Sequence, residues 1–204
     1  MEATGTVHLV DDDKSASKAI AAILQSVQLD VRAYTDAKSF LEGFRSSPPQ
    51  CLLLDLYMPS MTGLELQSQL EAANIDIPIV FLTGHGDVAT AVEALKHGAL
   101  DFIEKPARSE QIIDSVLKAI REDVAAMTRR SETSEYRQRL DSLSERERQV
   151  LDAVARGLSS KQIAFELGLS KKTIDLHRTR IMRKLGVGSA TELVRVYVMS
   201  QRDA

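Results

Sequence analysis

Short apolar runs alternate with longer amphipathic stretches through the first 120 residues of the chain. The runs are typical of buried strands, whereas the three-to-four-residue spacing of apolar positions in the stretches predicts helices. The predicted strands are Val7–Val10, Leu29–Tyr34, Cys51–Leu54, Ile79–Leu82 and Leu100–Ile103. The predicted helices are Lys14–Ser26, Ala37–Arg45, Gly63–Ala73, Asp87–Lys96 and a helix from Ser109 onward. This alternation predicts an α/β fold, a doubly wound five-stranded parallel sheet with helices on both faces.

The helical pattern that begins at Ser109 continues through residues 121–140, where charged residues, Ser and Thr become dominant. This composition predicts a largely helical linker. The stretch Ser144-Glu145-Arg146-Glu147 then has the form of a capping box, which marks the start of a new helix. Four helices of a small all-α domain are predicted: Glu145–Arg156, Ser160–Glu166, Lys171–Leu185 and Thr191–Met199. The chain thus divides into a first domain, 1–120, a linker, 121–140, and a second domain, 141–204.

Charge separates the two domains. Residues 1–120 carry 9 Lys and Arg against 17 Asp and Glu, whereas residues 141–204 carry 12 against 8. A basic second domain favours a polyanionic partner such as DNA. The only cysteine, Cys51, excludes an internal disulfide and a cysteine-based zinc cluster. Because the chain shows neither a signal segment nor an apolar stretch long enough to cross a bilayer, we expect a cytoplasmic protein with no membrane partner.

Chemically active side chains follow the predicted strands at their carboxyl ends. Asp11 and Asp12 follow the first strand, Asp55 the third, Thr83 the fourth and Lys105 the fifth. The carboxyl ends of parallel strands meet at one edge of the sheet, so these groups are expected to converge there. Three crowded carboxylates repel one another, and a hard divalent cation, most naturally Mg²⁺, would relieve the repulsion.

This combination of groups fits phosphoryl transfer onto Asp55. A carboxylate would attack, a cation would neutralise the developing charge, and Thr83 and Lys105 would bind the new phosphoryl group. Asp12 and Asp55 would hold the metal together with the backbone carbonyl of Tyr57. Taken without Asp55, the Asp11–Asp13 run is more often a strand-end turn that caps the following helix than a metal site.

The motifs around these residues resemble the receiver domain of two-component response regulators. They are Val10-Asp11-Asp12-Asp13, Leu54-Asp55-Leu56-Tyr57-Met58-Pro59 with Gly63, Leu82-Thr83-Gly84-His85-Gly86-Asp87, and Asp101-Phe102-Ile103-Glu104-Lys105-Pro106. The resemblance covers residues 6–120. It implies a flavodoxin-like receiver with Asp55 as the phosphoacceptor, a metal site at Asp11, Asp12, Asp55 and Tyr57, and a cis Lys105–Pro106 bond. It also implies that Phe102 rotates inward with Thr83 as a switch, although an aromatic at a strand end is as often a packing residue.

The second domain contains a helix, a glycine-containing turn and a second helix capped by Ser170, the order of a helix-turn-helix. Ile174, Ile181 and Leu185 share one face of the second helix, which leaves the polar face to enter a major groove. Between Lys171 and Lys184 lie six basic residues and one acid. The predicted DNA-binding set is Lys171, Lys172, Thr173, Asp175, Leu176, His177, Thr179, Arg180, Arg183 and Lys184. His177 has no ligand partner at metal spacing, so it is expected to pack or to contact phosphate.

The domain is similar to the LuxR-type DNA-binding domain. The resemblance lies in Leu143-Ser144-Glu145-Arg146-Glu147-Arg148-Gln149-Val150-Leu151, Gly157–Ala164, Thr173–Arg178 and Lys184-Leu185-Gly186-Val187. It implies that the last helix, Thr191–Met199, forms a dimer surface, with core packing as the alternative. The two halves together resemble response regulators of the NarL/FixJ class. That class implies a sensor histidine kinase, a homodimer formed on phosphorylation, double-stranded promoter DNA and RNA polymerase as partners.

Two other functions compete with this interpretation. An aspartyl-phosphate phosphatase also uses a strand-end aspartate with Mg²⁺, but such enzymes have a second acid where this chain has Tyr57. Without that acid to protonate a leaving group, we expect no enzyme beyond slow self-dephosphorylation. A regulator that works without phosphorylation is the other alternative, and the complete set of acids, Thr83 and Lys105 argues against it.

Overall fold

The computed structural model describes residues 4–84 and 88–201, which form two compact units, residues 1–127 and 128–204. Asp87, the predicted first residue of the fourth helix, lies outside the described residues, as do His85 and Gly86 of the same motif.

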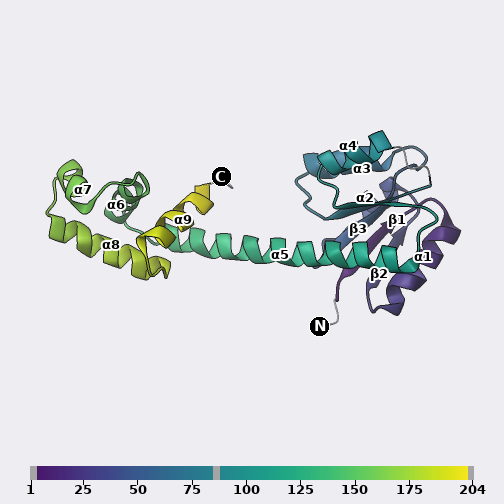
Figure 1. The fold of residues 1–204 in the computed structure, drawn as a ribbon, viewed down its shortest axis with the longest axis horizontal. Coiled ribbons are helices and arrows are strands. Elements are labelled where there is room, and N and C mark those ends of the chain that lie inside the picture. The colour runs from purple at the N-terminus through teal and green to yellow at the C-terminus, as the bar shows by residue number, and fades with distance from the viewer. Residues whose placement is uncertain (1–3, 85–87, 202–204) are drawn as a thin grey trace. The chain divides into compact units, whose positions relative to one another are not determined.

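The first unit is built on one five-stranded parallel sheet (Figure 1), in the order β2-β1-β3-β4-β5. The strands are β1 (Thr6–Val10), β2 (Asp30–Tyr34), β3 (Gln50–Asp55), β4 (Ile79–Thr83) and β5 (Asp101–Glu104). The helices that connect or follow them are α1 (Lys14–Ser26), α2 (Ala37–Gly43), α3 (Gly63–Ala72), α4 (Val88–Lys96) and α5 (Ser109–Asp141). The strand order reverses at β1, which confirms the predicted doubly wound fold.

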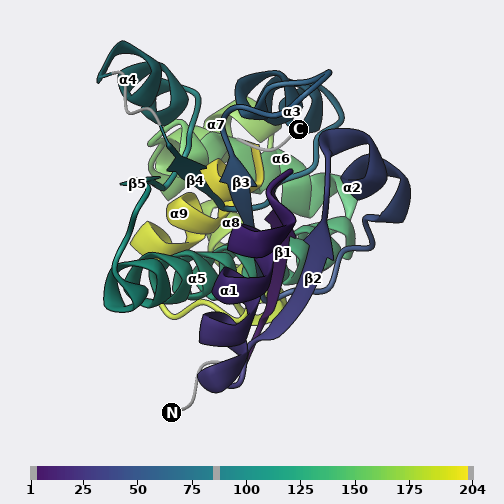
Figure 2. The same cartoon turned by 90° about the vertical axis from the view of Figure 1, so that its right-hand side faces the viewer.

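Helices cover both faces of the sheet (Figure 2), and each face has its own core. On one face α1 and α5 pack against Leu9 and Leu53, while on the other α2, α3 and α4 pack against Leu52 and Leu54. All four leucines have 0% exposed surface. Alternate residues of β3 therefore enter opposite cores, which is why this strand is a continuous apolar run in the sequence.

Gly63 sets how closely α3 approaches the end of β3. A Cβ atom at this position would lie 2.6 Å from the carbonyl oxygen of Asp55 and 2.8 Å from the Phe81 ring. The backbone N–H of Gly63 also donates to the carbonyl of Leu56, 2.8 Å away. The absence of a side chain thus allows α3 to begin directly beside the strand end that carries Asp55.

Helix α5 continues without interruption to Asp141, so the whole predicted linker is helical. The sequence has neither Gly nor Pro between Pro106 and Gly157, and the Glu135–Arg139 ion pair, 3.3 Å, supports the helix at a spacing of four residues. The charged residues, Ser and Thr of residues 121–140 therefore give the helix a polar surface, and the helix continues through them.

The second unit comprises the end of α5 and four further helices. They are α6 (Glu145–Ala155), α7 (Ser160–Leu167), α8 (Lys171–Leu185) and α9 (Ala190–Gln201). Ser144 begins α6 with the predicted capping box, and Gly168, in the left-handed conformation, ends α7 before the turn into α8. The core includes the predicted inner face of α8 (Ile174, Ile181 and Leu185).

Helix α9 bears on both interpretations of the last predicted helix. Leu193 is fully buried in the core of the second unit, whereas 44% of the surface of Val198 is exposed. Core packing thus explains Leu193, and an exposed apolar residue remains on the same helix. Among all described helices, none is long and apolar enough to span a membrane.

Candidate functional site

Asp55 ends β3 as a nearly buried carboxylate, with 7% of its surface exposed. Lys105 supplies the partner that such a group needs, because its ammonium lies 2.7 Å from Asp55 Oδ2. The other carboxylate oxygen, Oδ1, accepts a hydrogen bond of 3.2 Å from the backbone N–H of Tyr57. Both oxygens of Asp55 are therefore bound, and the carboxylate is held in a fixed orientation at the sheet edge.

Asp11 is the second carboxylate bound to Lys105. Its Oδ2 accepts from the Lys105 ammonium at 2.7 Å, and its Oδ1 accepts from the backbone N–H of Asp13 at 2.9 Å. No surface of Asp11 is exposed, and this burial raises the pKa of Asp11 by more than the hydrogen bond to Lys105 lowers it. Burial by itself would lower the pKa of Lys105, but hydrogen bonds to Asp11 and Asp55 outweigh burial and raise it.

The Asp11–Asp13 run divides between a helix cap and a cluster of carboxylates. Asp13 caps α1, because its side chain accepts from the backbone N–H groups of Ser15 and Ala16. Asp11 and Asp12 instead lie with Asp55, and one carboxylate oxygen from each of the three lies within 4.8 Å of the others. Mg²⁺ prefers oxygen ligands and is usually bound by one or two carboxylates together with water, so these residues fit the ion.

Thr83 and Phe102 lie on the two strands beyond Asp55. Thr83 ends β4 with its side chain buried, and its carbonyl accepts from the Lys105 backbone N–H at 2.6 Å. Parallel pairing of β4 with β5 therefore sets Lys105 beside Thr83. Phe102 is half-buried on β5, and its ring centroid lies 6.4 Å from that of Phe81 in the core. The Lys105–Pro106 peptide bond is cis, as the resemblance implied.

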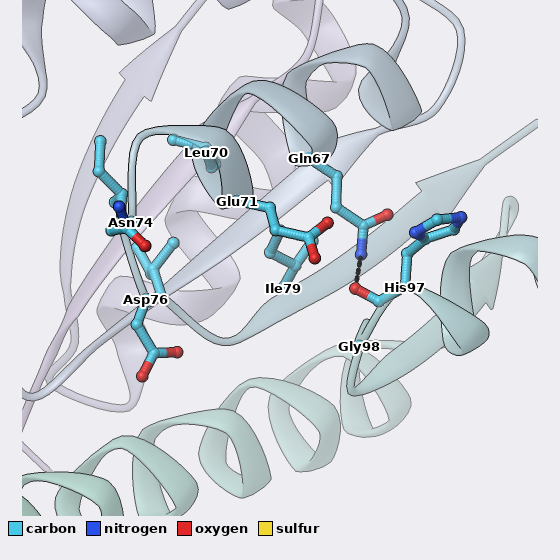
Figure 3. Close-up of a pocket in the computed structure, with 10 residues that line it drawn as sticks. Gln67, Leu70, Glu71, Asn74, Asp76, Ile79, His97 and Gly98 are labelled. Atoms are coloured by element: carbon cyan, nitrogen blue, oxygen red, sulfur yellow. Dashed lines mark hydrogen bonds between the residues drawn. The ribbon is translucent and has the colours of Figure 1, made fainter. Parts of the chain in front are cut away.

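A separate pocket lies at the opposite end of β4 (Figure 3). It has a volume of about 350 Å³ and is lined by the end of α3, the loop that follows it, the turn after α4 (His97 and Gly98) and Ile79, the first residue of β4. Gln67 donates from Nε2 to the carbonyl of His97 at 2.8 Å across it. Since Thr83 is the last residue of β4, this pocket is distinct from the carboxylate site.

Helix α8 presents the predicted DNA-binding residues in the second unit. Six neighbouring residues line one hollow on its exposed side: Ser170, Lys172, Thr173, Asp175, Leu176 and Thr179. Leu176 is 49% exposed, so one apolar side chain lies among the polar residues of this hollow. Lys171, Arg180 and Arg183 are exposed, and His177 is half-buried with a buried Nδ1.

Lys184 differs from the other basic residues of the predicted set. Its ammonium lies 2.7 Å from Glu147 Oε2 and 3.1 Å from the carbonyl of Ser142, both inside the second unit. The sequence pattern missed Glu147 and Arg139 as partners of α8, because both are distant in sequence and only the tertiary fold brings them together. Gly63 was part of a motif, but its contact with Asp55 was equally hidden.

Comparisons with known proteins agree with both halves of this architecture. Residues 7–117 match the response regulator receiver domain, and residues 141–197 match the luxR family of bacterial regulatory proteins. The protein is a transcriptional response regulator, belonging to the family with a receiver domain followed by a LuxR-type DNA-binding domain. Receiver domains act with a sensor kinase and generally bind Mg²⁺ at their acidic cluster, and LuxR-type domains bind DNA.

Similar proteins span nearly the full chain. Response regulator protein TodT of Pseudomonas putida is 40% identical over 190 residues, 93% of this chain and 84% of TodT. Transcriptional regulatory protein FixJ of Rhizobium meliloti is 42% identical over 191 residues, 94% of each chain. The solved structure of response regulator StyR is 40% identical with a TM-score of 0.78, covering 95% of this chain and 98% of StyR. The chain is consistent with the NarL/FixJ class.

Proposed function

We propose that Asp55 is the phosphoacceptor through which a sensor histidine kinase controls promoter binding by this protein. The observation that carries the proposal is the Lys105 ammonium, which lies 2.7 Å from both Asp11 and Asp55 at the carboxyl edge of the sheet. Two nearly buried carboxylates and one cation form a charged site into which a phosphoryl group can be accepted.

In the proposed reaction, a carboxylate oxygen of Asp55 attacks the donor phosphorus, and the bond from phosphorus to the donor breaks with its electron pair leaving on the donor. Lys105 then shifts from Asp55 to the new phosphoryl oxygens while it retains Asp11. Thr83 would donate its hydroxyl to the same group. Mg²⁺ bound by Asp11, Asp12, Asp55 and the Tyr57 carbonyl would neutralise charge on the transferring group.

Phosphorylation would then change the two strand ends beyond Asp55. Movement of Thr83 toward the phosphoryl group would leave space for the half-buried Phe102 to rotate inward. The added charge favours an active state that exists at low population beforehand. We propose that this state forms a homodimer, binds promoter DNA through α8 in the cytoplasm and engages RNA polymerase. Self-dephosphorylation would be slow, because Tyr57 replaces a second acid.

On α8 the proposed DNA contacts divide by chemistry. Lys171, Lys172, Arg180 and Arg183 would bind phosphates, whereas Asp175, Leu176 and Thr179 would contact base edges. Thr173 and His177 would support the same face. These residues surround or lie beside the hollow on the exposed side of the helix.

Intact mass spectrometry tests the phosphoacceptor directly. Incubation with Mg²⁺ and a small acyl phosphate should add one phosphoryl group to the wild-type chain and none to Asp55→Asn. Asp12→Asn, which alters the metal site, should slow the addition and leave the modified residue unchanged. An adduct that persists in Asp55→Asn would contradict the proposal.

A further inference from the structure

The C-terminal end of α8 is held by side chains from two other elements of the second unit. Arg139, near the end of α5, donates from Nη1 to the carbonyl of Leu185 at 3.1 Å. Lys184 reaches back to the α5–α6 junction, where it meets the carbonyl of Ser142 and the carboxylate of Glu147. The last carbonyls of a helix have no partner within the helix, and here Arg139 provides one.

Glu147 is a buried carboxylate that pairs with Lys184. Only 4% of its surface is exposed, and its Oε2 accepts both from Lys184 at 2.7 Å and from the backbone N–H of Ser144 at 2.8 Å. The Lys184 hydrogen bond is the main reason why the pKa of Glu147 falls to about 2. A buried carboxylate needs such a partner. Moving Lys184 away from Glu147 to a DNA phosphate would therefore leave an uncompensated buried charge.

Gly186 makes room for Arg139. It adopts a left-handed conformation with φ of 71°, and a Cβ atom there would lie 2.9 Å from Arg139 Nη1. The glycine therefore allows both the end of α8 and the close approach of the guanidinium. Arg139 also lies over the ring of Tyr136, 5.6 Å from its centroid, and pairs with Glu135, which orients its side chain from within α5.

We propose that Arg139, Glu147 and Lys184 form an anchor that positions α8 for DNA, and that Lys184 acts inside the domain and not on a DNA phosphate. The anchor rests on the proposed DNA-binding function. The two ends of α8 would have different roles. The exposed hollow, from Ser170 to Thr179, would contact DNA, and the anchor holds residues 184–186 at the other end. Fixing one end of a helix fixes the direction of the other.

The salt dependence of binding separates a positioning residue from a phosphate contact. A residue that neutralises a phosphate contributes about 0.9 to the slope of log affinity against log salt concentration, whether the DNA is specific or not. The charge of Lys184 is already balanced by Glu147, so its loss should leave that slope unchanged. Loss of position should instead lower affinity for a specific duplex and spare non-specific binding.

The experiment uses the full chain treated with acyl phosphate and Mg²⁺, a duplex that the treated wild-type chain selects from a random library and a scrambled duplex of equal length. We expect Lys184→Met and Arg139→Met each to lower affinity for the selected duplex about tenfold, because about 1.4 kcal/mol would then be needed to order the released end of α8 on binding. Affinity for the scrambled duplex and the salt slope should not change. Arg139→Lys, which retains a donor, should restore part of the loss.

Matched variants provide the controls. Arg137→Met removes the same charge from an exposed position of α5 and should bind like the wild type. Arg183→Met, next to Lys184, should weaken binding to both duplexes and lower the salt slope by about 1. Should Lys184→Met fail to fold, the Glu147→Gln/Lys184→Met pair leaves no lone buried charge and should show the same loss of specificity.

A slope that falls in Lys184→Met as in Arg183→Met would overturn the anchor and assign Lys184 to a phosphate. Variants that fold less stably but keep the ratio of specific to scrambled affinity would also overturn it, since the contacts would then serve stability alone. If the wild-type chain selects no duplex, the DNA-binding function itself fails and the anchor falls with it. If the wild type selects one and the anchor variants match it, only the anchor fails.

Discussion

Replacing Lys105 by Met tests the charge arrangement at the carboxylate site. The substitution keeps an unbranched side chain of similar length and removes the cation that Asp11 and Asp55 share. Both carboxylates are nearly buried, with 0% and 7% of their surfaces exposed. Without Lys105 they would face each other uncompensated, so the free energy of unfolding of the first unit should decrease.

The size of the decrease follows from the contacts. Lys105 makes two charged hydrogen bonds of 2.7 Å, and its side chain is 23% exposed. Each such bond is worth about 1.5–3 kcal/mol, and removing one partner of a buried pair costs about 3–5 kcal/mol. Protonation of Asp11, whose pKa is already raised by burial, would relieve part of the cost. We therefore expect a loss of about 2–4 kcal/mol at neutral pH.

Urea denaturation with pulsed hydrogen exchange of β1 and β3 peptides would measure this loss for the first unit within the intact chain. Lys38→Met, a control on an 83% exposed lysine, should change stability by less than about 0.5 kcal/mol. Saturating Mg²⁺ should restore much of the lost stability, because a divalent cation replaces the ammonium. A Lys105→Met protein as stable as the Lys38→Met control would refute the reasoning.

Three further substitutions test other parts of the structure. Burial lowers the pKa of His8, so the unfolded chain binds the proton more tightly than the folded chain does. The free energy of unfolding should therefore fall as pH drops below about 6.5. His8→Gln should remove this pH dependence in denaturation curves from pH 7 to 5. The pKa of Glu147 is about 2, so its ionised form should stabilise the fold fully above about pH 4.5 and lose this effect toward pH 2. Glu147→Gln should remove the pH dependence of the opening free energy of α8, measured by hydrogen exchange over that range. Gly63→Ala should cost about 1–3 kcal/mol in thermal unfolding because of the contact with Asp55. Gly84→Ala should cost less, since no atom of the described residues lies within 4 Å of a Cβ there.

The sheet was predictable because its strands bury both faces. A strand covered on two sides must be apolar throughout, so β3 and β4 appear as continuous runs, and a polar residue at the end of such a run marks the sheet edge. The convergence of Asp11, Asp55 and Lys105 followed from parallel topology alone. The two hydrogen bonds from Lys105 to Asp11 and Asp55 match that expectation.

Other features depend on the tertiary fold and left no local signal. Residues 121–140 lose their apolar stripe, so the sequence predicted a largely helical linker there and did not show that it continues α5 as one unbroken helix to Asp141. Lys184 lies on a basic helix, where the pattern favoured a DNA contact, yet the fold brings Glu147 within 2.7 Å. Such pairs join positions that are far apart in sequence. Local patterns of residues along the chain do not reveal which of these positions come into contact.

The central claim is that phosphorylation of Asp55 controls DNA binding. The most direct measurement follows intact mass and affinity for the selected duplex on the same samples, for wild type and Asp55→Asn, before and after treatment with acyl phosphate and Mg²⁺. We expect a phosphoryl adduct together with tighter binding in the wild type and neither change in Asp55→Asn. Wild-type protein that gains the adduct and binds the duplex no more tightly would contradict it.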